Sequence, residues 1–169
     1  AIRHLGILYQ DLEQYEKAYN YFLQALKVNP RGFQALSNLA TIHMENKNYE
    51  LAHKCLSQSF KINSNYVPTI NNLASLYHKL NRPTQALDMS SRALKLQPNN
   101  LITLNQYAKA LIINNDLNEA IQILEKYHKT FPDHEDFALN LSTAYKEIGE
   151  FEKSNEIINI QFNNFILKK

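Results

Sequence analysis

Apolar residues along the chain recur at the spacing of one face of an α-helix. A first stripe has positions i, i+3, i+4 and i+7, which is typical of a helix that buries one side. Its members are Leu36, Leu39, Ala40 and His43. After a short polar break a second stripe of the same kind follows, formed by Tyr49, Ala52, Leu56 and Phe60. The two stripes predict two helices of about 12–14 residues joined by a turn.

This pattern repeats every 34 residues along the whole chain, with no insertion or deletion. Two series of small residues mark the period. The first is Gly6, Ala40, Ala74, Ala108 and Ser142, and the second is Ala18, Ala52, Ala86, Ala120 and Ser154. An apolar series accompanies them, namely Leu5, Leu39, Leu73, Tyr107 and Leu141. Small residues facing each other let the two helices of a hairpin approach closely. Because a single hairpin cannot bury its apolar face, the hairpins must stack.

Polar breaks between the stripes contain residues that end one helix and begin the next. They are Asn46-Lys47-Asn48, Asn81-Arg82-Pro83, Asn114-Asn115-Asp116 and Gly149-Glu150. Asn and Gly suit a helix C-terminus, and Asn, Asp or an early Pro suits the start of a new helix. The prediction is therefore an all-α solenoid of five helical hairpins.

The first hairpin resembles the tetratricopeptide repeat (TPR) family most closely. The matching residues are Leu5, Gly6, Tyr9, Ala18, Phe22, Ala25 and Pro30. The resemblance implies a right-handed superhelix in which the first helix of each hairpin lines a concave groove. We expect one array over residues 1–169, with units of about 1–32, 33–66, 67–100, 101–134 and 135–168.

The fifth unit departs most from the family pattern. Ser154 stands where the other four units have Ala, and Ile166 replaces the usual Pro. Its second helix has a broad apolar face, which includes Ile160, Phe162, Phe165 and Ile166. Two interpretations stay open: this helix caps the array, or it packs on a domain outside this sequence. The chain begins inside a helical pattern without Met, so we expect it to be a fragment of a longer protein.

Composition narrows the classes of partner. The sequence is 44% hydrophobic and 20% charged and contains no run long enough to span a membrane. A net charge of +2 without a long basic run argues against nucleic acid as a partner. A single cysteine, Cys55, excludes an internal disulfide and suits a reducing compartment, so we expect a cytoplasmic protein.

Candidate chemistry is sparse. Three isolated glycines cannot form a phosphate-binding loop, and the six histidines show no metal-binding spacing. We interpret His43 as a packed core histidine and Cys55 as a small half-buried hydrophobe. The prediction is a protein without enzymatic activity, bound metal or cofactor.

Polar residues on the first helix of each hairpin are the candidate binding site. The predicted groove residues are His4, Asn38, Thr41, Asn72, Ser75, Gln106, Lys109, Asn140 and Thr143. One column within them, spaced by 34 residues, is His4, Asn38, Asn72, Gln106 and Asn140. Amide side chains both donate and accept hydrogen bonds, so such a column matches the backbone of an extended peptide. It resembles the asparagine ladder of O-GlcNAc transferase. The alternative is compositional bias, since Asn accounts for 21 of the 169 residues.

The groove lacks the Lys and Arg pair with which TPR proteins of the chaperone co-factor type grip a terminal carboxylate. We therefore expect a protein-interaction scaffold that binds an extended polypeptide segment. Two alternatives are the substrate-recognition region of a larger glycosyltransferase or sulfotransferase, and an array that self-associates through its solenoid ends.

Overall fold

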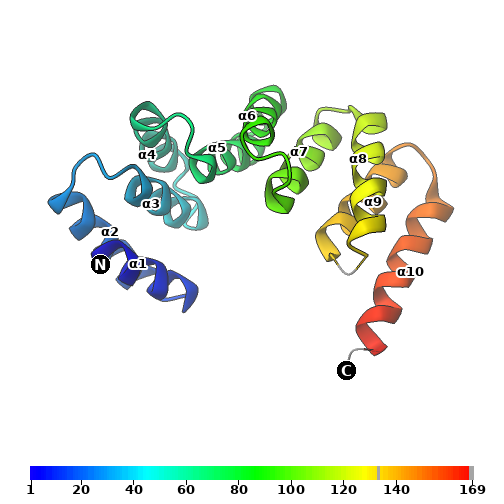
Figure 1. Ribbon diagram of the computed structural model, residues 1–169, viewed down its shortest axis with the longest axis horizontal. Coiled ribbons are helices and arrows are strands. Elements are labelled where there is room, and N and C mark those ends of the chain that lie inside the picture. Colours follow the sequence, from blue (N-terminus) through cyan, green and yellow to red (C-terminus); the bar gives the residue numbers. More distant parts are fainter. Residues whose placement is uncertain (133, 168–169) are drawn as a thin grey trace. The chain divides into compact units, whose positions relative to one another are not determined.

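The computed structural model describes residues 1–132 and 134–167, with side chains up to Phe162. Within these residues it contains ten α-helices and no strand (Figure 1). The helices are α1 (Ile2–Asp11), α2 (Tyr15–Val28), α3 (Phe33–Glu45), α4 (Tyr49–Ile62), α5 (Val67–Lys79), α6 (Pro83–Leu96), α7 (Leu101–Ile113), α8 (Leu117–Thr130), α9 (Glu135–Glu147) and α10 (Phe151–Leu167). The predicted all-α fold of helical hairpins is confirmed.

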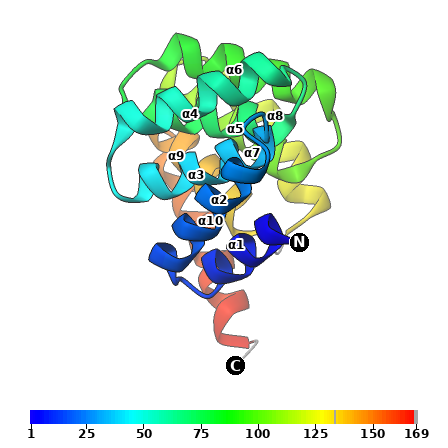
Figure 2. The same ribbon diagram turned by 90° about the vertical axis from the view of Figure 1, so that its left-hand side faces the viewer.

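The chain divides into two compact units. Unit 1 covers Ala1–Leu96 and unit 2 covers Gln97–Lys169. In unit 1 each helix from α1 to α6 packs against the next, and α3 also contacts α5 (Figures 1 and 2). In unit 2 the same arrangement joins α7 to α10, and α7 also contacts α9. First helices of successive hairpins therefore lie side by side within each unit, whereas a single array over residues 1–169 stays a prediction.

Each hairpin turns at a residue with a left-handed backbone. These residues lie 34 apart and are Glu13, Lys47, Asn81, Asn115 and Gly149. In the second hairpin the Lys47 N–H donates to the Met44 carbonyl at 3.0 Å, and the Asn48 N–H donates to the His43 carbonyl at 2.8 Å. This pair of bonds is a Schellman motif, which satisfies the last carbonyls of α3. The predicted helix ends are confirmed at these turns.

Small residues form the contact inside each hairpin. In the first, a Cβ built on Gly6 would lie 2.5 Å from Cε1 of Phe22. The corresponding alanines are completely buried, namely Ala18, Ala40, Ala52, Ala74, Ala86, Ala108 and Ala120. In the fifth hairpin both positions are serines, and the Ser142 and Ser154 hydroxyls are hydrogen-bonded at 2.8 Å. Small size, as predicted, brings the paired helices together.

Apolar residues of the second helix of a hairpin join it to the next hairpin. Phe22 on α2 is buried with Leu39 and Ile42 of α3. Leu56 on α4 occupies the same position one repeat later and is buried with Leu73 and Leu76 of α5. Each such residue thus belongs to its own hairpin and to the interface with the next, which explains why the hairpins stack.

The two predicted inert side chains are confirmed as core residues. His43 is 8% exposed and meets the edge of the Tyr19 ring, with the ring centroids 5.8 Å apart. Burial lowers the pKa of His43, because it disfavours the charged imidazolium. Cys55 is half-buried, and burial raises the pKa of its thiol, so it is a poor nucleophile.

Candidate peptide-binding surface

The predicted groove residues of unit 1 lie on α1, α3 and α5. His4 is exposed, whereas Asn38, Thr41, Asn72 and Ser75 are half-buried. Because α3 and α5 are in contact, the last four residues share one polar surface made of amides and hydroxyls. Such a surface offers hydrogen bonds without net charge.

Asn72 does more than face outward from this surface. Its Nδ2 lies 3.2 Å from Ser37 Oγ, 3.2 Å from Thr41 Oγ1 and 3.4 Å from the Ser37 carbonyl oxygen. The amide thus donates to α3 from the neighbouring helix α5. Asn72 ties two successive hairpins together, and these bonds use only the donor side of its amide.

Unit 2 repeats this connection. Asn140 on α9 donates from Nδ2 to Oδ1 of Asn105 on α7 at 2.7 Å. Both bonds join residues 35 apart in the sequence. The acceptors belong to a second column, which sequence analysis did not single out: Arg3, Ser37, Asn71, Asn105 and Leu139. Its signal is a polar side chain placed directly before each amide of the first column.

Asn38 differs from Asn72 and Asn140. Its Nδ2 is buried and has no hydrogen-bond partner among the described residues. The corresponding partner position is Arg3, whose guanidinium can only donate and whose Nη2 lies 3.1 Å from Nε2 of His4. A buried donor without an acceptor costs about 1–3 kcal/mol. An acceptor brought by a bound molecule would remove that cost.

The remaining groove residues of unit 2 are mixed in character. Gln106 is half-buried, and Lys109 and Thr143 are exposed. The Thr143 hydroxyl donates to the Leu139 carbonyl of its own helix at 2.8 Å. Leu139 and Ile113 on the same helices are exposed and apolar. The surface of unit 2 therefore combines one cation with apolar side chains, whereas the surface of unit 1 is neutral and polar.

Groups suited to other chemistry are few. Over the described part of the chain, His, Cys, Asp and Glu do not gather in threes as a metal site would require. None of the described helices is long and apolar enough to cross a membrane. Two tyrosines are strongly perturbed: burial and hydrogen bonds to Glu119 and Glu125 raise the pKa of Tyr107 and Tyr145 to about 12. Both hydroxyls stay protonated at neutral pH.

Family models for the tetratricopeptide repeat match residues 4–53, 77–137 and 111–160. No match was found among curated protein sequences.

Solved structures with a similar fold are numerous. PilW, described as a type IV pilus biogenesis factor, has a TM-score of 0.85 at 19% identity, over 95% of this chain and 74% of that one. TTC0263, a thermophilic TPR protein of Thermus thermophilus, has a TM-score of 0.80 at 19% identity, over 96% and 89%. YrrB, described as a TPR protein with an unusual peptide-binding site, has a TM-score of 0.73 at 19% identity, over 96% and 84%.

Proposed function

Because the chain belongs to the tetratricopeptide repeat family, we propose that it is a scaffold that binds an extended polypeptide segment along its first helices. The observation that supports this most directly is the unpartnered amide of Asn38 on the neutral polar surface of α3 and α5. An extended backbone presents a carbonyl or an N–H at every residue and suits such a surface.

The amides of the column have different tasks in this proposal. Asn38 makes a bond to the ligand: a small rotation of its amide about the Cβ–Cγ bond brings Nδ2 to a peptide carbonyl. Asn72 and Asn140 chiefly position their helices, since their Nδ2 atoms donate to Thr41 and Asn105. The carbonyl oxygen of the Asn72 amide is then the acceptor for a peptide N–H.

Backbone recognition predicts weak side-chain preferences, which a random peptide library displayed on phage can measure. Peptides selected on the 169-residue chain should be extended and share little consensus. Their affinities for Asn38→Ala should then be measured by fluorescence anisotropy. We expect a loss of about 2- to 12-fold, the worth of one hydrogen bond.

The matched control is Asn20→Ala, because Asn20 is an exposed asparagine on a second helix, α2. Both substitutions gain slightly in helix propensity, so neither should unfold the protein. The proposal is wrong if Asn38→Ala binds the selected peptides as tightly as the parent, or if Asn20→Ala weakens binding equally. Asn72→Ala should instead lower the melting temperature, because it removes the link between α5 and α3.

A further inference from the structure

The first helix carries an apolar side that has no cover in the structure. Leu5 and Leu8 on α1 are 42% and 53% exposed. Their counterparts in the next two hairpins are all buried, namely Leu39 and Ile42 on α3, and Leu73 and Leu76 on α5. Those residues are buried by Phe22 of α2 and Leu56 of α4, which belong to the preceding hairpin. Figure 2 views the molecule from the side on which α1 lies.

The last hairpin has the complementary surface. Ile158 on α10 occupies the position of Phe22, Leu56 and Leu124, which are completely buried, yet Ile158 is 43% exposed. One turn later Phe162 is 61% exposed. The other two residues of the predicted apolar face, Phe165 and Ile166, have side chains outside the described residues.

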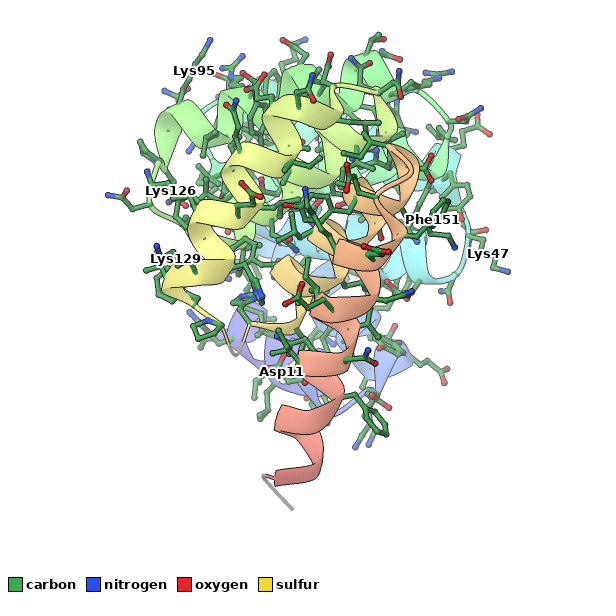
Figure 3. All side chains as sticks on the ribbon, turned by 90° about the vertical axis from the view of Figure 1, so that its right-hand side faces the viewer. Asp11, Lys47, Lys95, Lys126, Lys129 and Phe151 are labelled. Atoms are coloured by element: carbon green, nitrogen blue, oxygen red, sulfur yellow. The ribbon has the colours of Figure 1, made fainter. Side chains whose placement is uncertain are left out.

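A cavity of about 420 Å³ marks this surface. It lies between the start of α9 and the second half of α10, and its lining is Glu135, Asp136, Ala138, Leu139, Ile158, Gln161 and Phe162. Figures 1 and 3 show that the last turns of α10 extend past the start of α9. In Figure 3, Phe151 marks the opposite, first end of α10. The exposed part of α10 is therefore accessible to another helix.

We propose that the α9–α10 surface of one copy binds α1 of a second copy. The second α1 then packs on α10 as α3 packs on α2 and as α5 packs on α4. In this register Leu5 and Leu8 of the second copy meet Ile158, just as Leu73 and Leu76 meet Leu56 within the chain. The occupant is a second copy because α1 already has the residues that this interface requires.

Charge and polarity agree with this register. Since α7 and α9 lie side by side and α3 contacts α5 in the same way, the start of the second α1 would lie near the start of α9. Arg3 of the second copy thus approaches the acidic rim formed by Glu135 and Asp136. The amide link between hairpins is absent from this junction, because His4 would face Leu139 instead of an Asn facing a polar side chain. The contact is consequently weaker than those within the chain, and reversible.

Each copy carries one α1 surface and one α9–α10 surface, so the contact joins different surfaces and differs from a two-fold dimer. Association should therefore continue beyond the dimer as the concentration rises. This distinguishes the proposal from a symmetric pairing of two α10 helices, which would end at a dimer.

Sedimentation velocity of the 169-residue chain over a range of concentrations tests the proposal. We expect the average mass to rise above the 19.6 kDa of one copy without stopping at twice that value. Leu8→Asp and Phe162→Asp should each weaken association by about 10-fold or more, since each removes an apolar contact. Leu51→Asp, at an exposed leucine in the first turn of α4, is the control and should associate like the parent.

Mixing the two variants gives the decisive result. Leu8→Asp retains an intact α9–α10 surface, and Phe162→Asp retains an intact α1, so an equimolar mixture should form heterodimers and nothing larger. Circular dichroism verifies that each variant is folded. A parent that stays at one copy at every concentration overturns the proposal, as does a mixture that associates no more than its components.

Discussion

The second and fifth hairpins place different residues at three matched positions, 102 residues apart. Inside the hairpin, the second has Ala40 against Ala52, both completely buried, and the fifth has the hydrogen-bonded Ser142 and Ser154. Size is thus what the position demands, because either pair lets the helices approach closely. Polarity is tolerated when both members are polar, since each hydroxyl satisfies the other.

The turn and the core show two further differences. At the left-handed turn position the second hairpin has Lys47, with φ of 59°, and the fifth has Gly149, with φ of 84°. On the first helix, the second hairpin buries His43, whereas the fifth has Tyr145, whose hydroxyl donates to Glu125. The second hairpin therefore carries a strained turn and a titratable core residue that the fifth avoids.

The largest effect should come from splitting the serine pair. Ser142→Ala leaves the buried Ser154 hydroxyl without its partner, and we expect a loss of about 1–3 kcal/mol in the free energy of unfolding. The double variant Ser142→Ala/Ser154→Ala recreates the arrangement of the second hairpin, so most of that loss should be recovered. Urea unfolding of the parent, both single variants and the double variant measures the coupling. Additive losses would mean that the two hydroxyls do not depend on each other.

A smaller effect should come from exchanging the turn residues. Lys47→Gly removes the cost of a left-handed backbone at a residue with a Cβ, which exceeds the entropy that glycine loses on folding. We expect the free energy of unfolding to rise by about 0.5–1 kcal/mol. Gly149→Lys should change it by a similar amount in the opposite direction. Thermal unfolding of both variants checks the signs, and equal signs would show that the turn conformation does not decide stability here.

These comparisons also show what the sequence could predict. Helix positions, turns and the small hairpin contacts follow from a 34-residue period that leaves local signals in every repeat. The hydrogen bonds of Asn72 and Asn140 did not follow, because they depend on side chains of two different helices. A column of amides is compatible with ligand binding and with links between hairpins, and only atomic positions separate the two. The same holds for Ile158, whose pattern is that of a core residue although it is exposed.

The smallest effect, and the most specific, should be the pH dependence that His43 confers. Burial lowers the pKa of His43 in the folded protein, whereas the unfolded chain has the ordinary value of about 6.5. The unfolded state therefore binds a proton more readily, so stability is full above pH 6.5 and falls as the pH falls below it. His43→Tyr introduces the residue of the fifth hairpin. Tyr145 has its pKa raised to about 12, so its contribution is lost only as the pH rises above about 10. Urea unfolding between pH 5 and 8 should thus give a flatter profile for His43→Tyr than for the parent, whatever its stability at neutral pH. His4→Gln, at an exposed histidine, should retain the parental slope below pH 6.5, and a His43→Tyr profile as steep as the parent's would assign the acid sensitivity to other groups.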